Sequence, residues 1–363
     1  MKRGISLYLD LLRFLAALVV LFQHLSWEHF SGGVFWQIGP YGAQAVIVFF
    51  VLSGYVIGYV TDRPDRTARR YAVDRLARIY SVALPAVLLT FALDAAGSWL
   101  RPDLYAGLWV NVDGAIWRQF LRNLLFLNQL WGADYYPGSN VPYWSMGYEV
   151  WYYVAFGLFL FLPRRWSVPA AIAVLVFVGP RVAGLFCVWL LGLAAYRLSR
   201  DRWPLSPAWG KALFFGAPVL LLAYELSTVR PLAPIPWQTG WELAKTATVG
   251  AFIAAHLLGA ARVAPMLERW LERWALPIRF MAGRSFSLYL FQLPVLQFLL
   301  SLMPWPPTSW FSRITLAVGT LAIVLLLAEV TERRKDVWRR LFDRLLPTSR
   351  PASSGAGTTP GPA

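Results

Sequence analysis

The sequence predicts an all-α membrane protein with about ten transmembrane helices and both termini in the cytoplasm. Three observations predict it: high hydrophobicity, apolar runs long enough to cross a bilayer, and an uneven distribution of Lys and Arg. Of the 363 residues, 58% are hydrophobic and 15% are charged, whereas soluble domains average about 45–50% and about 25%. The mean hydropathy of +0.49 points the same way. Water is therefore not the main solvent of this chain.

Apolar runs close to the roughly 20 residues that a helix needs to span a bilayer recur along the whole chain. The run at 167–180 is short and ends in Gly-Pro, so a tilted or re-entrant segment is an alternative there, and totals of nine or eleven stay open. Segment 115–131 is amphipathic, which predicts a helix lying on the membrane surface. The ten expected spans are 5–26, 43–60, 81–98, 143–162, 167–180, 182–197, 212–228, 243–260, 285–303 and 311–330.

The positions of the basic residues predict the orientation, because cytoplasmic loops collect Lys and Arg. Of 34 such residues, 26 fall in segments that are cytoplasmic if the N-terminus is inside, 7 fall on the other side, and Arg13 lies within the first span. We therefore expect both termini inside. The net charge of +15 could suggest nucleic acid, but it is spread over loops that would face anionic lipid. We expect the lipid bilayer as a partner and no nucleic acid.

Domain organisation is expected to be simple. Residues 1–346 should form one membrane domain, and residues 347–363 are rich in Pro, Ser, Gly and Ala, which predicts a disordered tail. Cys187 is the single cysteine, so the chain has no internal disulfide and no multi-cysteine metal site, and we expect no metal. Segment 98–142 is the largest on the outer side and is the expected cap over an acceptor.

Polar groups within the first span are the first candidates for chemistry, because a charge inside a membrane is costly and usually functional or paired. Arg13 and His24 are eleven residues apart, which places them on one helical face about 16 Å apart. Asp10 precedes Arg13 by three residues on the same stripe. One interpretation is an Asp10–Arg13 ion pair with His24 at the interface. The other is a cation and a proton-transfer imidazole on one wall of a channel.

A second group of polar residues lies in WSMGYEVWYYV. Glu149 is in the middle of an expected span, and Ser145, Tyr152 and Tyr153 fall on its helical face. A carboxylate near His24 would stay charged and orient the imidazole ring. The alternative is a structural carboxyl group bonded to a serine or tyrosine.

A third group is the arginine-rich RRYAVDRLARIY after the second span. Arg75 and Arg78 are spaced i and i+3 on an expected short helix, and Arg69 and Arg70 precede them. Orientation alone could explain this charge. The density of the cluster also suits polyanion recognition, since the planar guanidinium group binds phosphate well.

Together these groups resemble the membrane acyltransferase family 3, which includes bacterial O-antigen and exopolysaccharide O-acetylases and antibiotic O-acyltransferases. Six segments carry the resemblance, in order and through nearly the whole chain: LDLLRFLAALVVLFQH, FFVLSGYVIG, RLARIY, NLLFLNQLW, VPYWSMGYEVWYY and SFSLYLFQLPV. The sequence departs from the family pattern at Ser81, where proline is usual, at Met146-Gly147-Tyr148, and at Gln292, where histidine is frequent. Gln292 removes one candidate base.

The resemblance implies ten helices, acyl-CoA as donor with acetyl-CoA the expected one, and an acceptor hydroxyl reached from the far side of the membrane. By position, His24 matches the family's essential histidine and Glu149 its acidic residue, and we expect both to be catalytic. Arg13, Arg75 and Arg78 match its arginines and should bind the CoA. The residues expected to bind the acceptor are Asn140, Trp144, Ser145 and Tyr152.

The resemblance also implies the setting of the reaction. We expect a multi-pass protein of the inner (plasma) membrane and a carbohydrate or glycolipid acceptor. Since no hydrolase-like domain follows the membrane domain, transfer would be direct or would pass to a separate periplasmic transferase. His24 could act as general base or carry the acyl group as an acyl-imidazole. His29 and His256 are single histidines that we expect to be structural.

Two rival functions deserve comparison. A transporter or flippase for a lipid-linked sugar would also need many spans and a few buried charges. It would be expected to show paired internal repeats with matching Gly or Pro interruptions, and the sequence shows neither. A purely structural or sensory scaffold would leave the charges of Arg13, His24 and Glu149 unexplained.

Overall fold

The computed structural model describes residues 1–106, 115–200, 205–227 and 240–346, and every regular element in these ranges is a helix. Part of the expected cap, at 107–114, and the expected tail, at 347–363, lie outside the described residues. The α-helices are α1 Arg3–Leu25, α2 Glu28–Ser31, α3 Gly42–Thr61, α4 Ala68–Leu100, α5 Ile116–Leu124, α6 Met146–Phe161, α7 Arg164–Val178, α8 Pro180–Arg200, α9 Pro207–Ser227, α10 Gly240–Arg273, α11 Ala275–Ala282, α12 Ser285–Ser301, α13 Trp310–Val330 and α14 Lys335–Leu345. Short 3₁₀ turns occur at η1 Gly39–Tyr41, η2 Pro102–Leu104, η3 Leu130–Gly132, η4 Val141–Ser145 and η5 Glu332–Arg334.

Each of the ten expected spans coincides with a helix, which confirms the all-helical prediction. Within the described residues, seven helical stretches are long and apolar enough to cross a membrane, and α12 is a shorter apolar helix. Exposed side chains on α9 and α13 include Phe215, Val219, Val318 and Leu326, and apolar surface of this extent is typical of contact with lipid. The chain is therefore a membrane protein, while the total of ten spans and the orientation stay predictions.

Two helices are much longer than the spans expected for them. α4 has 33 residues and α10 has 34, against the 18 residues of 81–98 and of 243–260. The N-terminal extension of α4 begins after Thr67, whose hydroxyl caps the helix by accepting a hydrogen bond from the Arg70 backbone N–H. This extension is the expected short arginine-bearing helix, fused directly to the span.

The amphipathic surface helix was expected over 115–131, and the structure ends it at Leu124. The backbone turns at Phe126, which has a φ of 57°. This unusual conformation is held by α6, because the indole Nε1 of Trp151 donates a 2.9 Å hydrogen bond to the Phe126 carbonyl. A tertiary contact, which local periodicity does not reveal, therefore ends the helix early.

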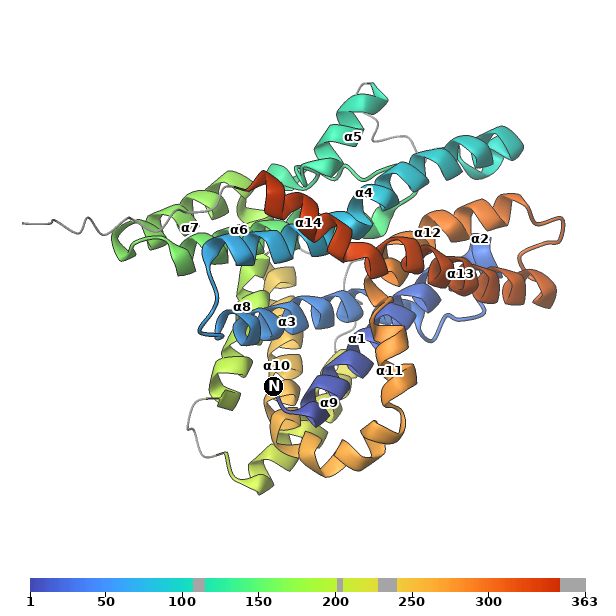
Figure 1. Ribbon diagram of the computed structural model, residues 1–363. Helices are drawn as coiled ribbons and strands as arrows, with labels where there is room; N and C mark the ends of the chain where they lie inside the picture. Colours follow the sequence, from blue (N-terminus) through green and yellow to red (C-terminus); the bar gives the residue numbers. More distant parts are fainter. Residues whose placement is uncertain (107–114, 201–204, 228–239, 347–363) are drawn as a thin grey trace, which may run out of the picture.

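Helix α1 lies within the bundle and contacts α3, α10, α11 and α12 (Figure 1). The amphipathic α14, red in Figure 1, packs along α4. Its Trp338 and Phe342 lie against the ring of Tyr80, and Asp343 forms an ion pair with Arg69. The C-terminal segment is thus fixed to the arginine-bearing part of α4.

Helices α3 and α8 approach each other closely at glycines. A Cβ atom on Gly54 would lie 2.0 Å from the Trp189 carbonyl oxygen, and one on Gly192 would lie 1.9 Å from that of Val51. Small residues at such crossings let helix backbones approach in membrane proteins. The close approach lets the Trp189 indole donate a 3.2 Å hydrogen bond to the hydroxyl of Ser53, so it also places a residue of the site described next.

Candidate functional site

Three cavities follow α1 from its N-terminal half to its C-terminal end. Asp10 and Arg13 line the first, Arg13 also lines the second, and His24 lines the third. We call them the vestibule, the arginine cavity and the histidine cavity. Each shares residues with the next: Arg13 and Arg78 line the first two, and Val46 and Tyr289 line the last two. Arg13 and His24, which were predicted to share one face of a helix, thus line cavities that adjoin one another along that helix.

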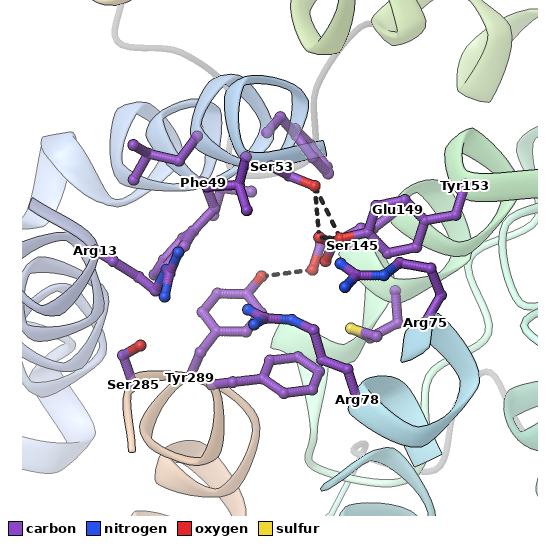
Figure 2. Close-up of a pocket in the computed structure, with 16 residues that line it drawn as sticks. Arg13, Phe49, Ser53, Arg75, Arg78, Ser145, Glu149, Tyr153, Ser285 and Tyr289 are labelled. Atoms are coloured by element: carbon purple, nitrogen blue, oxygen red, sulfur yellow. Dashed lines mark hydrogen bonds between the residues drawn. The ribbon is translucent and has the colours of Figure 1, made fainter. Parts of the chain in front are cut away.

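The arginine cavity gathers three guanidinium groups, those of Arg13 from α1 and of Arg75 and Arg78 from α4 (Figure 2). Arg13 lies 3.6 Å from the Asp10 carboxylate. Neither Arg75 nor Arg78 forms a salt bridge within the described part of the chain, and Nε of Arg75 is buried with no hydrogen-bond partner there. The cavity therefore carries an excess of positive charge that would favour a bound anion.

The predicted arginine cluster is divided by the fold into two kinds of residue. Arg66, Arg69 and Arg70 form ion pairs with Asp74, Asp343 and Asp65 respectively. Arg75 and Arg78 instead line the cavity, where they contact the rings of Tyr153 and Phe286. The first kind is thus neutralised within the protein, and the second kind forms no salt bridge within the described residues.

Glu149 supplies a carboxylate to the arginine cavity. Its Oε1 accepts hydrogen bonds from Ser53, at 2.9 Å, and from Tyr153, as Figure 2 shows. With three arginines and one glutamate among the lining residues, this carboxylate offsets only part of the positive charge. The alternative interpretation, a carboxyl group bonded to a serine and a tyrosine, describes these contacts.

The histidine cavity lies between the C-terminal end of α1, the N-terminal end of α3 and η4, and its volume is about 300 Å³. His24 and Trp144 are on its wall, and the edge of the Trp27 ring meets the imidazole with 5.0 Å between ring centroids. Its lining otherwise consists mainly of small and apolar residues. The imidazole of His24 is buried and borders a cavity large enough to hold a small reacting group.

Gln292 lies beside the imidazole ring of His24. Its Oε1 and the Nδ1 of His24 are both buried, and neither has a hydrogen-bond partner within the described part of the chain. Buried polar atoms are seldom left unpaired, and at functional sites they often wait for substrate or water. The position at which this sequence departs from the family pattern is therefore part of the site, and its proximity to His24 was not foreseen.

The structure does not form the expected pair between His24 and Glu149. Glu149 lines the arginine cavity and is held by Ser53 and Tyr153, whereas His24 lines the histidine cavity. Helical periodicity placed each residue on the inner face of its own helix. It could not show how far along the bundle each would lie once α1 and α6 had packed.

The four residues expected to bind an acceptor are placed differently from one another. Trp144 lines the histidine cavity and Ser145 lines the arginine cavity. Asn140 and Tyr152 are fully buried and line none of the three cavities: the Asn140 amide donates to the Leu290 carbonyl at 2.8 Å, and the Tyr152 hydroxyl donates to that of Val182, also at 2.8 Å. These two hydrogen bonds position η4 and α6.

The vestibule contains cations that the sequence suggested only as topological signals. Its volume is about 380 Å³, and Arg279, Arg333 and Lys335 join Arg13 and Arg78 on its wall. The acidic residues Asp10, Glu332 and Asp336 are also present, so cations exceed carboxylates. Arg279 belongs to α11, Arg333 to η5 and Lys335 to the first turn of α14, and only the fold brings them to Arg13.

The other two histidines lie outside the three cavities. Both ring nitrogens of His256 are engaged, Nε2 with the Tyr8 hydroxyl and Nδ1 with the Phe214 carbonyl at 2.8 Å. His29 is exposed and contacts the rings of Trp27 and Phe30. Their contacts fit the structural role expected for them.

Comparison with known proteins connects this geometry to a family. Residues 6–329 match the family described as an acyltransferase domain. Similar proteins include acyltransferase MdmB of Streptomyces mycarofaciens, 28% identical over 70% of this chain and 63% of that protein. Exopolysaccharide production protein ExoZ of Rhizobium meliloti (strain 1021) is 29% identical over 35% of this chain and 37% of its own length.

Nodulation protein 10 of Rhizobium leguminosarum bv. viciae is 27% identical over 46% of this chain and 47% of its own length. The chain thus spans less than two thirds of each of these relatives. No solved structure matches it. Because the family match includes α1, α4, α6 and α12 almost completely, it takes in the arginine and histidine cavities, whereas Glu332, Arg333, Lys335 and Asp336 of the vestibule wall lie beyond residue 329. The chain belongs to the membrane acyltransferase family 3.

Proposed function

We propose that this protein is a plasma-membrane O-acyltransferase that moves an acyl group, expected to be acetyl, from cytosolic acyl-CoA to a hydroxyl of a cell-envelope or exported carbohydrate. One observation carries the proposal: a cation-rich vestibule, an arginine cavity and a histidine cavity adjoin one another along α1. Acyl-CoA has a matching order of parts, since an anionic nucleotide is joined by a long neutral arm to a thioester. The acyltransferase named among the relatives supports the same reaction class.

The donor would bind with its phosphates at the basic end of this series. Arg78 borders both the vestibule and the arginine cavity, and Arg279, Arg333 and Lys335 are added from the vestibule wall. Charge-assisted hydrogen bonds from guanidinium groups to phosphate are among the stronger polar contacts in proteins. The neutral arm then runs past Arg13 and brings the thioester toward His24. In this arrangement Glu149 serves as counter-charge to Arg75 and Arg78.

The chemistry would take place in the histidine cavity. As general base, His24 takes the proton of the acceptor hydroxyl while the oxygen attacks the thioester carbonyl. The carbon–sulfur bond then breaks, and the CoA thiolate leaves and receives the proton from the imidazolium. In the covalent variant, an imidazole nitrogen attacks the thioester carbonyl first, the carbon–sulfur bond breaks and CoA leaves as the thiolate. The acceptor oxygen then attacks the acyl-imidazole, the bond from the acyl carbon to nitrogen breaks, and the hydroxyl proton passes to the CoA thiolate. Gln292 can hold the ring or a reacting hydroxyl through its amide, but it cannot act as a base.

The acceptor would approach from the end of the bundle opposite the vestibule. Trp144 and Trp27 line that cavity and offer ring faces to a sugar. A relative named for exopolysaccharide production supports a carbohydrate acceptor. Transfer is direct, or passes to a separate periplasmic transferase.

The test supplies radiolabelled acetyl-CoA to membranes that contain the protein and measures label in the envelope glycans by mass spectrometry and scintillation counting. Because general-base catalysis contributes about 10²- to 10⁴-fold, His24→Ala should lose that much transfer. His256→Gln is the matched control, since it removes an imidazole outside the three cavities and should retain transfer. Both variants must reach the membrane in equal amounts.

Rapid quenching separates the two mechanisms. Label attached to the protein and released by hydroxylamine, in the intact protein and not in His24→Ala, would indicate the acyl-imidazole. Vigorous transfer by a correctly inserted His24→Ala protein would refute the assignment of His24 under either mechanism.

A further inference from the structure

The boundary between the arginine cavity and the histidine cavity is formed by very few side chains. Of the described residues that line the two, only Val46 of α3 and Tyr289 of α12 belong to both. These two residues therefore lie on the shortest side-chain route between the arginines and the cavity of His24. Tyr289 is the larger of them, and its side chain is almost fully buried.

Tyr289 is tied in place from two sides. Its hydroxyl oxygen lies within hydrogen-bond distance of the Pro142 carbonyl oxygen, at 3.0 Å, and of Oγ of Ser145, at 2.9 Å, both in η4 (Figure 2 shows the contact with Ser145). Its ring lies against Phe49 of α3, with 5.3 Å between centroids. The tyrosine therefore bridges α12, η4 and α3 across the passage.

The arginine cavity is much smaller than the histidine cavity in this structure. The free volume of the arginine cavity is about 50 Å³, enough for only a few water molecules, whereas the histidine cavity has about 300 Å³. An acyl thioester on its pantetheine arm does not fit into the smaller volume. Side chains at the boundary must move before the acyl group can reach His24, and rotation of Tyr289 requires that its hydrogen bonds to η4 break and that its ring leave Phe49.

We propose that Tyr289 is a movable partition that separates the arginine cavity from the histidine cavity and limits the width of the acyl group that passes. With the partition closed, water and ions from one side of the membrane do not reach the other through the site. When it opens, the ring of Tyr289 and the side chain of Val46 define the width of the opening. The size limit rests on the proposed acyl transfer, but the closure does not.

Closure is tested without any enzymatic assay. A cysteine is introduced by Ala43→Cys, at a residue that lines the histidine cavity alone, after Cys187→Ser has removed the native thiol. A charged, membrane-impermeant thiosulfonate reagent is then applied to sealed, oriented vesicles from the face that carries α14. With Tyr289 intact, labelling from this face should be slow. Tyr289→Ala should accelerate it at least tenfold, and labelling from the opposite face should be unchanged.

One further variant distinguishes the effect of the Tyr289 ring from the effect of its hydrogen bonds, and a second variant serves as the control. Tyr289→Phe keeps the ring and loses the hydrogen bonds, so its labelling rate should lie between those of the intact protein and of Tyr289→Ala. It also provides a reading if the alanine variant does not fold. Phe215→Ala is the matched control, because it removes an aromatic ring that is exposed on α9 and lines none of the three cavities, and its labelling rate should equal that of the intact protein.

Acyl width is tested with acetyl-, butyryl- and hexanoyl-CoA. Tyr289→Ala should raise the butyryl-to-acetyl transfer ratio at least tenfold, and Phe215→Ala should not. Fast labelling of the intact protein, or equal rates for Tyr289→Ala and the intact protein, would overturn the partition. Absence of transfer from every donor in the intact protein would instead refute the proposed function and leave the labelling result standing.

Discussion

Replacing Arg75 and Arg78 with glutamine tests whether the arginine cavity binds the donor. Both guanidinium groups line that cavity, and neither forms a salt bridge within the described residues. Their removal therefore breaks no ion pair, and the Glu149 carboxylate keeps its hydrogen bonds from Ser53 and Tyr153. The fold should survive, and the loss should appear in ligand binding.

The expected magnitude follows from the contacts that would be lost. A hydrogen bond to a charged group contributes about 1.5–3 kcal/mol, which corresponds to a loss of about 10- to 150-fold in affinity for each single variant. The two arginines are one helical turn apart and would share one ligand, so the double variant should lose more than either single variant but less than the product of the two losses.

The assay is titration calorimetry of CoA with the purified protein in detergent, together with the KM for acetyl-CoA in membranes. Arg70→Gln is the matched control: it removes the same charge from the same segment, but Arg70 is ion-paired with Asp65 and lines none of the three cavities. Its affinity for CoA should be unchanged. Equal losses of CoA affinity in Arg70→Gln and in the double variant would refute specific binding by Arg75 and Arg78. Unchanged CoA affinity in the double variant would mean that the arginine cluster serves only membrane orientation.

Three other predictions concern packing, topology and a structural histidine. Gly192→Ala places a Cβ atom 1.9 Å from the Val51 carbonyl oxygen, so overpacking should lower stability by about 1–3 kcal/mol; thermal unfolding in detergent checks this, and Gly216→Ala, which meets open space, should not be destabilised. Reporter fusions at Arg118 and at the C-terminus should report opposite sides of the membrane, and signals from the same side would contradict the predicted orientation. His256→Phe removes two side-chain hydrogen bonds and should cost about 1–3 kcal/mol of stability, with an unchanged KM for acetyl-CoA as the contrasting measurement.

The local pattern of the chain was sufficient to predict its ten long apolar helical segments, but not α2, α11 or α14. Each apolar run of bilayer length became a helix, because burial in lipid requires every backbone hydrogen bond to be satisfied within the helix itself. Periodicity also placed Arg13 and His24 on one helix, and Arg75 and Arg78 one turn apart on another. These are properties of single helices, and 3.6 residues per turn is enough to derive them.

Relations between helices were decided by the tertiary structure. Glu149 and Gln292 each lie on a helix that packs near α1, but only Gln292 reaches the His24 ring, while Glu149 joins the arginines. Which residue meets which depends on the depth and rotation at which α6 and α12 pack against their neighbours, and side-chain volumes at many contacts set both. The packing of the helices likewise decides which basic and acidic residues line the vestibule.

The sequence by itself thus determined the membrane setting, the helices and the chemical types of residue available to the site. The tertiary structure alone decided that the site is a series of three cavities, that Arg75 and Arg78 form no salt bridge within the described residues, and that Tyr289 lines both the arginine cavity and the histidine cavity. The physical reason is the range of the interactions: helix formation depends on residues within a few turns of one another, whereas a cavity and its boundary depend on contacts such as that between Tyr289 and Ser145, which are 144 positions apart in the chain.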